Sequence, residues 1–426
     1  MNELLLSDKN IIWHPFTPLL GANDPLLITS AEGIYLHTHD GRKIIDAVSS
    51  WWVNIHGHSN KEIAQALAQQ ASTLEHVIFA GFTHEPAITL AKNLIKILPS
   101  NQTKIFFSDN GSTAVEVGLK MAFQYWHNQN IKKKKVIALD GAYHGDTFGS
   151  MSVGERGMFT DPFAPYLFDV SFIDFPTADN QQSVLAQFKN LLATNEVGAF
   201  IFEPLVQGAG GMRMYSAEFL DVLIREAQAH DVICIADEVF TGFGRTGKLF
   251  ASHHLQQQPD ILAISKGITG GTMALGVTSC SQKIVSAFAS SAFDKTFFHG
   301  HSYTGNPIAC AAANASFRLL MRESCQEQIR MIGSEHASFR DQVKGHKNVK
   351  AARSLGTILA IELKTAEGSS YANALRKTIY PYFLERNILL RPLGNTLYVL
   401  PPYVITVQEL RLIYDTIESF LESVGV

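Results

Sequence analysis

Features typical of membrane, secreted and nucleic-acid-binding proteins are largely missing from this sequence. Lys and Arg number 35 against 39 Asp and Glu, a formal net charge of −4, so the chain offers no broad positive field to a phosphate backbone. It has no run of about 18 apolar residues, which a membrane helix needs. Its first residues, MNELLLSDKN, lack the basic start and the apolar stretch of a secretory signal. We therefore expect a cytoplasmic protein that binds neither nucleic acid nor membrane.

Cysteine is scarce as well. The chain has 4 cysteines, Cys234, Cys280, Cys310 and Cys325, and they lie too far apart for the paired spacings of a zinc site or a redox disulfide. We expect buried thiols in a reducing compartment, and we expect no metal.

Apolar and small residues, in contrast, are abundant. Of the 426 residues 46% are hydrophobic and 17% are charged, and 31 Gly and 15 Pro are spread along the chain. This composition is typical of a protein with a substantial core, which excludes both wholesale disorder and a small disulfide-stapled module. The length predicts two or three substructures, or one large α/β domain with appendages.

The middle of the chain alternates short apolar runs with longer helix-like stretches. The predicted strands are 104–108, 135–139, 198–202, 232–236 and 260–264. These runs are nearly continuous in apolar residues, as expected of parallel strands that helices cover on both faces. The sequence therefore predicts a large α/β domain.

The two ends of the chain follow different patterns. After about residue 320, helices alternate with strand-like runs, which is typical of a smaller α+β unit. The first fifty residues are loop-rich apart from a strand-like stretch near 33–46, and they are too short to fold alone. We expect them to pack on the C-terminal unit or on another subunit. The predicted divisions are 1–50, 51–320 and 321–426.

Two predicted strands end in residues suited to one cofactor. The strand over 232–236 is followed by Asp237, and the strand over 260–264 is followed by Ser265 and Lys266. Ligands bind at the carboxyl ends of strands in open α/β sheets. A lysine buried there costs desolvation unless its amine is neutral, which is the state that Schiff-base chemistry requires. Asp237 alone is equally consistent with a helix cap or a loop salt bridge.

Glycine-rich segments offer several candidates for binding phosphate. The segment GFGRTGKL at 242–249 matches the glycine and lysine spacing of a nucleotide loop, but Leu249 replaces the Ser or Thr that binds magnesium, and we reject it. The turn Asp109-Asn110-Gly111-Ser112-Thr113 leads from a strand into a helix, so its free backbone N–H groups favour an anion. An ordinary N-cap is the alternative.

A further strand end carries Tyr143 and His144 within the segment GAYHG. Tyr143 is suited to lie flat on an aromatic cofactor, although a surface or core tyrosine is the more common explanation for a single motif. His144 has no partner at metal-ligand spacing, so we interpret it as a structural, hydrogen-bonding histidine.

Taken together, these motifs resemble the class III pyridoxal-phosphate aminotransferases in their order and spacing. The resemblance covers nearly the whole chain and rests on Asn110-Gly111-Ser112, Tyr143-His144-Gly145, Asp237-Glu238 with TGFGRTG, Ser265-Lys266-Gly267 and Gly305-Asn306-Pro307. It implies the α/β fold type I of these enzymes: a large domain with a mostly parallel sheet, and a smaller α+β domain formed by the two chain ends. The implied cofactor is pyridoxal 5′-phosphate.

The resemblance also implies a role for each matching residue. Lys266 holds the cofactor covalently, is displaced by the amino donor and then moves a proton between substrate and cofactor. Asp237 keeps the ring nitrogen protonated, and Tyr143 stacks on the ring, where Tyr143 and Lys266 also border the substrate.

For the phosphate, the resemblance implies Gly111 and Ser112 together with a hydroxyl from a second subunit, which makes the site part of a homodimer. Here that hydroxyl belongs to Ser302, where threonine is common in the family; the change keeps the hydroxyl.

Further motifs resemble one branch of this class. They are Trp13-His14-Pro15, Ser49-Ser50-Trp51-Trp52, QGAGGMRMY at 207–215, Gly270-Gly271-Thr272-Met273, Arg391-Pro392, and Tyr398 with Pro401-Pro402-Tyr403. That branch transfers an amino group from S-adenosylmethionine to 8-amino-7-oxononanoate in biotin biosynthesis. Two alternatives stay open: lysine as the donor to the same acceptor, and a general ω-amino acid or diamine aminotransferase. A binding protein on a retired enzyme fold is disfavoured because the implied cofactor residues are all present.

The implied acceptor is a nine-carbon keto acid, which needs a cation for its carboxylate and apolar walls for its chain. Arg391 suits the first role because a guanidinium binds a carboxylate bidentately. Trp51, Trp52 and Tyr398 suit the second. The alternatives are a structural ion pair for Arg391 and core packing for the aromatic residues.

Two more residues complete the implied substrate contacts. Gly300 matches a substrate-binding position. Phe16 stands where the family often has tyrosine, and the missing hydroxyl removes one hydrogen bond at this position.

Overall fold

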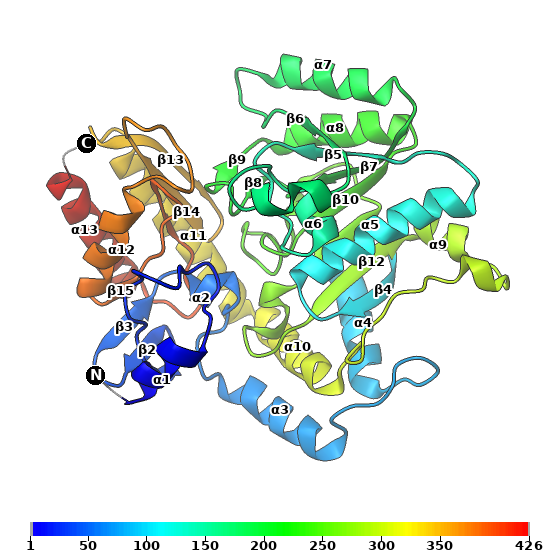
Figure 1. Ribbon diagram of the computed structural model, residues 1–426. Helices are drawn as coiled ribbons and strands as arrows, with labels where there is room; N and C mark the ends of the chain where they lie inside the picture. Colours follow the sequence, from blue (N-terminus) through cyan, green and yellow to red (C-terminus); the bar gives the residue numbers. More distant parts are fainter. Residues whose placement is uncertain (1–2, 425–426) are drawn as a thin grey trace.

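A seven-stranded sheet organises the larger part of the molecule. The computed structural model describes residues 3–424 (Figure 1). The strand order is β4-β12-β11-β10-β7-β5-β6. The strands are β4 (Gln102–Ser108), β5 (Lys135–Leu139), β6 (Val170–Ile173), β7 (Val197–Phe202), β10 (Ile233–Asp237), β11 (Ile261–Ile264) and β12 (Gly276–Ser281). All neighbouring pairs are parallel except those of β12, which runs antiparallel to both β11 and β4.

Helices cover both faces of this sheet (Figure 1). The helices of this part of the molecule are α3 (Lys61–Thr73), which packs on α10, and α4 (Glu85–Ile97), α5 (Gly111–Asn128), α6 (Phe148–Ser152), α7 (Gln181–Leu192), α8 (Ala217–Ala229), α9 (Gln282–Phe288) and α10 (Pro307–Leu320). Successive residues of one strand enter different cores: Ile233 and Ile235 pack in the cluster that includes α5, whereas Cys234 and Ala236 pack in the cluster on the other face. Burial of both faces explains why the strands are apolar throughout, as the sequence predicted.

The smaller part of the molecule contains two sheets, of order β1-β2-β3-β15 and β13-β14-β16. The strands are β1 (Ile28–Glu32), β2 (Tyr35–Thr38), β3 (Lys43–Asp46), β13 (Val349–Leu355), β14 (Ile358–Leu363), β15 (Ile388–Leu389) and β16 (Thr396–Val399); the helices are α1 (Glu3–Ile11), α11 (Glu323–Val343), α12 (Arg376–Glu385) and α13 (Val407–Ser423). β15 pairs in parallel with β3, with Ile388 opposite Ile45. Both chain ends therefore contribute to one sheet. The division points at residues 50 and 320 stay predictions.

Short elements lie between the two parts. The turn α2 (Ser49–Trp52) follows β3, and the hairpin of β8 (Val206–Gln207) and β9 (Arg213–Met214) follows β7. β5, β10 and β11 are neighbours or near neighbours in the sheet and run in the same direction, so the segments after them meet at one edge.

Candidate active site

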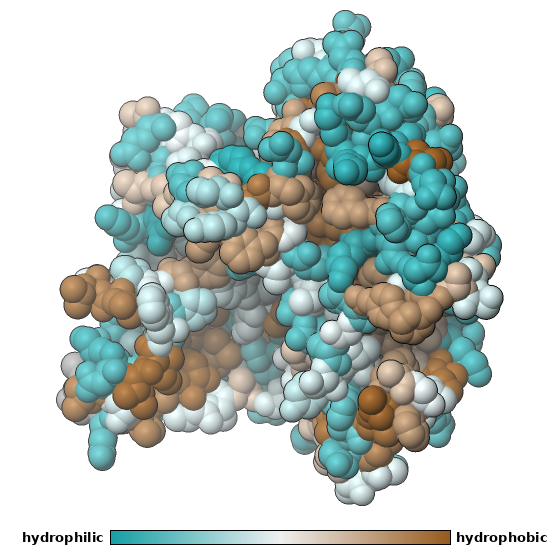
Figure 2. All heavy atoms as spheres, turned by 45° about the vertical axis from the view of Figure 1, so that its right-hand side comes forward, coloured by the Kyte–Doolittle hydropathy of each residue, from teal (hydrophilic) through white to brown (hydrophobic). Residues whose placement is uncertain are grey.

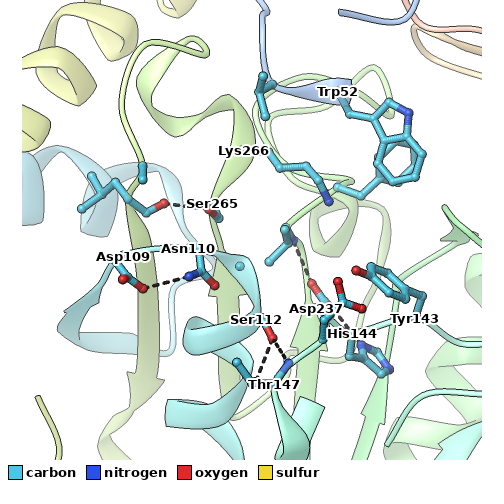
Figure 3. A pocket seen from close by; sticks show the side chains of 18 of the residues that line it. Trp52, Asp109, Asn110, Ser112, Tyr143, His144, Thr147, Asp237, Ser265 and Lys266 are labelled. Atoms are coloured by element: carbon cyan, nitrogen blue, oxygen red, sulfur yellow. Dashed lines mark hydrogen bonds and ion pairs between the residues drawn. The ribbon is translucent and has the colours of Figure 1, made fainter. Parts of the chain in front are cut away.

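A cavity of about 700 Å³ lies at this edge of the sheet (Figure 3). Among its lining residues are six that the sequence predicted for the site: Trp52, Gly111, Ser112, Tyr143, Asp237 and Lys266. They come from α2, the start of α5, the last residue of β10 and the segments after β5 and β11. The fold thus brings together residues that are far apart in the chain.

Lys266 reaches the cavity directly after β11. Its side chain is partly buried, and its Nζ atom lies 4.9 Å from the centre of the Trp52 ring. Burial lowers the pKa of Lys266, while the carboxylates of Asp237 and Glu203 act in the opposite direction. The net lowering gives this amine a larger neutral fraction than a surface lysine has, and a neutral amine is the nucleophilic form. The backbone of Lys266 is left-handed, with φ +43°.

Asp237 and His144 form a buried pair on the opposite wall (Figure 3). Asp237 Oδ2 lies 2.7 Å from His144 Nδ1, and Asp237 Oδ1 accepts a hydrogen bond of 3.0 Å from the Val239 N–H. The imidazole fixes the orientation of the carboxylate. The sequence predicted a hydrogen-bonding role for His144 but not this partner, which is 93 residues away in the chain.

Glu203 is a cavity residue that the sequence analysis missed. It follows β7, and its carboxylate accepts backbone hydrogen bonds from Tyr143 (3.0 Å) and Gly208 (2.8 Å). Burial raises the pKa of Glu203 to about 7. The carboxylate ties the turn that carries Tyr143 to the loop after β8. The available signal was its place at the end of an apolar strand, like that of Asp237.

The start of α5 lines the cavity at the turn that the sequence predicted for an anion. Asn110 caps the helix by accepting a hydrogen bond of 3.0 Å from the Thr113 N–H, and the Thr113 hydroxyl donates to Asp109. A Cβ atom at position 111 would lie 2.5 Å from Val239, so only glycine fits without a shift. Ser112 Oγ accepts a hydrogen bond of 3.0 Å from the Thr147 backbone. The first N–H groups of the helix and the Ser112 hydroxyl are therefore available at one place.

Tyr143 borders the same cavity and is 37% exposed. Burial raises the pKa of its hydroxyl, and the neighbouring Asp146 adds to the effect. The hydroxyl therefore stays protonated at neutral pH and can donate a hydrogen bond.

The residues predicted for the substrate chain lie beside Trp52. The Trp52 indole N–H donates to the Tyr398 hydroxyl at 3.1 Å, and both side chains are buried. Trp51 is 41% exposed; its ring packs edge-on against Phe16 at 5.6 Å and lies 4.8 Å from the Arg391 guanidinium. These residues form an aromatic surface that continues from the cavity toward solvent.

Arg391 has no acidic partner among residues 3–424: its described contact is the Trp51 ring. The structural ion pair considered from the sequence is thus absent from the described part of the chain. Arg245, in contrast, is 1% exposed and donates to the carbonyl oxygens of Pro401 and Trp52, both at 3.1 Å, which is a structural role in its loop.

Six predicted residues are not among those that line the cavity: Phe16, Trp51, Arg391 and Tyr398, which are described above, and Gly300 and Ser302. Gly300 and Ser302 lie on the exposed segment between α9 and α10.

Other features of residues 3–424 bear on the sequence predictions. No helix there is long and apolar enough to cross a membrane, and no group of three His, Cys, Asp or Glu side chains there is placed to hold a metal ion. The cysteines are free; Cys325 is only partly buried, unlike the other three.

Comparisons with known proteins agree with this geometry. The sequence model of the family described as "Aminotransferase class-III" matches residues 21–421. A protein of Synechococcus elongatus named adenosylmethionine-8-amino-7-oxononanoate aminotransferase is 48% identical over 421 residues, which cover 97% of this chain and 99% of that protein. The crystal structure of an enzyme of the same name from Methanocaldococcus jannaschii superposes with a TM-score of 0.93 at 35% identity and 99% coverage of each chain. An omega transaminase from Pseudomonas jessenii in complex with PMP superposes with a TM-score of 0.91 at 26% identity, covering 99% of this chain and 98% of that one.

The chain therefore belongs to the class III aminotransferases, which depend on pyridoxal 5′-phosphate. The residues present fit this cofactor. The cavity offers a partly buried amine with a lowered pKa for its aldehyde, a buried carboxylate for its ring nitrogen, and the start of a helix without a side chain at Gly111 for its phosphate.

Proposed function

We propose that this chain transfers an amino group from S-adenosylmethionine to 8-amino-7-oxononanoate, which yields 7,8-diaminononanoate in biotin biosynthesis. The observation that carries the proposal is an unpaired guanidinium, that of Arg391, on the aromatic surface that leads to Lys266. An acceptor that ends in a carboxylate and has a long apolar chain matches both features. The full-length similarity to proteins named for this reaction supports the same conclusion.

In this proposal the cofactor is held at three points. The first turn of α5, with Gly111 and Ser112, binds the phosphate, and Asp237 holds the proton on the ring nitrogen, with His144 fixing its orientation. Tyr143 covers a face of the ring. When bound, pyridoxal 5′-phosphate withdraws electrons from the carbon that carries the amino group, which makes the proton on that carbon acidic.

Lys266 accepts and donates that proton. Its amine points into the cavity, and its lowered pKa leaves it able to accept the proton from the amino-bearing carbon of the substrate and to release it again (Figure 3). The Trp52 ring lies over the amine and shields it from water on that side.

On the substrate side, Arg391 binds the carboxylate of the acceptor, while Phe16, Trp51, Trp52 and Tyr398 line its carbon chain. The phenyl ring of Phe16 offers apolar contact but no hydroxyl, so specificity for a polar donor group must come from other residues.

The proposal includes a homodimer with shared sites. The partner subunit's Ser302 would reach the phosphate, and Gly300, on the same segment, would border the substrate. The exposed position of this segment, away from the cavity of its own chain, supports the arrangement. We place the reaction in the cytoplasm, where the free thiols would stay reduced.

The test is the visible spectrum of the cofactor-loaded protein before and after S-adenosylmethionine is added without any keto acid. We expect conversion of the pyridoxal band to that of the pyridoxamine form, followed by recovery of the first band when 8-amino-7-oxononanoate is added. Conversion by lysine but not by S-adenosylmethionine would change the donor and keep the acceptor. Conversion by neither would favour a general ω-amino acid aminotransferase.

A further inference from the structure

The turn α2 has an unusual backbone. All 4 of its residues, Ser49–Trp52, have positive φ angles, which are +51°, +44°, +70° and +75° in chain order. The Trp52 N–H donates to the Val48 carbonyl at 3.0 Å, so the segment is one turn of left-handed helix. None of these residues is glycine, asparagine or aspartate, and L-residues in this conformation place Cβ too close to the next carbonyl. Such strain persists only where the surroundings enforce it.

A buried carboxylate supplies that enforcement. Asp46, the last residue of β3, is 0% exposed. Its Oδ1 atom accepts hydrogen bonds from the backbone N–H groups of Val48 (3.2 Å) and Ser50 (3.0 Å), and its Oδ2 atom accepts from the Ser50 hydroxyl (2.7 Å). These bonds hold the first half of the turn in the left-handed conformation.

His58 completes the arrangement from the following loop. Its Nε2 atom lies 2.9 Å from Asp46 Oδ2, and its Nδ1 atom lies 2.9 Å from the Asn54 amide nitrogen. An amide nitrogen can only donate, so Nδ1 accepts and the proton of the neutral ring sits on Nε2, directed at the carboxylate. Asp46 is therefore fixed by the loop after α2 as well as bonded to the turn itself.

The turn determines where both tryptophans point. Trp52 is turned inward, to within 4.9 Å of Lys266 Nζ, whereas Trp51 is turned outward, to within 4.8 Å of the Arg391 guanidinium. A right-handed or extended segment would send these adjacent side chains in other directions.

We propose that Asp46 and His58 are positioning residues that clamp α2 in its left-handed turn and so place Trp52 over the catalytic amine and Trp51 beside the carboxylate-binding arginine. This inference rests on the proposed function for the identity of the substrate, but not for the clamp itself. Neither residue is among those that line the cavity: Asp46 acts through the backbone and the side chain of Ser50, and His58 acts through Asp46.

The test compares cofactor-loaded wild type with Asp46→Asn, and Asp221→Asn serves as the matched control. Asp221 is also a buried carboxylate that accepts backbone hydrogen bonds, from Gln256 and Gln257, but it lies on α8. The readouts are the circular dichroism of the visible cofactor band, which senses the position of the Trp52 ring, and separate KM and kcat values for the keto acid. For Asp46→Asn we expect an altered dichroic band and a KM raised about tenfold, with the cofactor still bound. Asp221→Asn should retain the wild-type band and KM.

A second substitution separates the clamp from general destabilisation. Ser50→Gly in the Asp46→Asn background lowers the cost of a positive φ, so it should recover a large part of the lost KM and of the dichroic band. If Asp46→Asn does not fold, Ser50→Ala, which removes a single bond to Asp46, should shift both readouts in the same direction to a smaller extent.

A wild-type dichroic band and KM in Asp46→Asn would overturn the clamp, and so would the same result in Ser50→Ala where that variant is used. Failure of Ser50→Gly to recover the band and KM in the Asp46→Asn background would also overturn it. If wild type does not act on the keto acid, the proposed function fails while the dichroic band, which needs no substrate, still decides on the clamp.

Discussion

At the scale of one residue, the unpaired positive charge of Arg391 indicates what kind of ligand the site can bind. Arg391 is partly buried and lies over an aromatic ring rather than beside a carboxylate of residues 3–424. Partial burial of an unpaired guanidinium costs free energy, which a ligand carboxylate would recover. Substitution of this residue therefore tests binding of the acceptor separately from binding of the cofactor.

Substitution of Arg391 should therefore change acceptor binding alone. A hydrogen bond to a charged group contributes about 1.5–3 kcal/mol, so Arg391→Ala should raise the KM for 8-amino-7-oxononanoate by about 10- to 100-fold. The rate of the donor half-reaction should stay unchanged, because Arg391 is not among the residues lining the cofactor cavity. Steady-state kinetics with the keto acid and stopped-flow spectra with the donor measure the two effects.

Arg391→Lys is the control for that experiment. It keeps the charge but loses the bidentate geometry, so its KM should fall between those of wild type and Arg391→Ala. An unchanged KM in Arg391→Ala would remove the carboxylate-binding role and, with it, the main structural argument for this acceptor.

At the scale of one element, the start of α5 has the features that an anion would need. Its N-cap residue Asn110 and the capping hydroxyl of Thr113 satisfy the backbone groups of the turn, while Gly111 keeps the approach open. Both hydroxyl groups of this turn have partners within the protein: Thr113 Oγ1 is bonded to Asp109 and to the backbone of Asn110, and Ser112 Oγ is bonded to the hydroxyl and the backbone N–H of Thr147.

Adding one methyl group at the start of α5 should weaken cofactor binding. In Gly111→Ala the new Cβ would lie 2.5 Å from Val239 Cγ1, so the helix start or Val239 must move. Overpacking of this kind costs about 1–3 kcal/mol. We expect a higher dissociation constant for pyridoxal 5′-phosphate, measured by titration of the apoprotein, and a lower melting temperature of the apoprotein. Gly345→Ala, where a Cβ meets nothing within 4 Å, is the matched control and should change neither. Wild-type cofactor affinity in Gly111→Ala would mean that this glycine is not needed at the phosphate site.

The elements differ in how well the sequence predicted them. The runs at 135–139 and 198–202 correspond to β5 and β7 because a strand buried on both faces needs apolar residues at every position. β12 (GVTSCS) was not predicted, since small polar residues buried in a sheet carry no hydrophobic signal. The left-handed turn α2 was not predicted either, because SSWW contains no residue that favours positive φ, and the clamp depends on contacts with Asp46 and His58.

Burial of a lysine is another feature that the sequence pattern does not reveal. The lysine run at 132–135 gives no hint that Lys133 is only 7% exposed, with its amine donating to the carbonyls of His230 and Asp231 at the end of α8. Long-range pairs of this kind are invisible to pattern analysis.

At the scale of the whole molecule, the two chain ends meet in one sheet and the site lies beside their junction. Asp46 illustrates the connection: it pairs with Leu389 in the β3–β15 ladder and also holds the turn that carries Trp51 and Trp52. The sequence predicted a small unit built from both ends, but it could not predict this register, because nothing local specifies which residues of two short strands pair.

The surface near Ser302 is where we expect a second copy of the chain to bind. The segments 75–82 and 296–305 lie side by side, since the His76 and Tyr303 rings are 5.4 Å apart and the Asn306 amide donates to the Glu75 carbonyl. In Figure 1 the first segment projects from the molecule after α3, and in Figure 2 hydrophobic atoms reach the surface in several places on one face. Large apolar side chains on the two segments are exposed: Ile78 (60%), Phe82 (62%), Phe298 (59%) and Tyr303 (65%).

A second copy of the chain would cover these side chains and receive Ser302, so dimerisation and cofactor affinity should change together. Wild type should sediment at twice the mass of the 47.0 kDa chain. Phe82→Asp places a charge among the apolar groups and should shift the protein toward monomers with weaker pyridoxal 5′-phosphate binding. Leu412→Asp, a change at a 50% exposed residue of α13, should leave both the mass and the affinity unchanged. Ser302→Ala should keep the dimer and lower only the affinity, because it removes a hydroxyl without disturbing the apolar contact. If wild type is a monomer and still binds pyridoxal 5′-phosphate tightly, Ser302 has no role in binding the cofactor, because Ser302 does not line the cavity of its own chain.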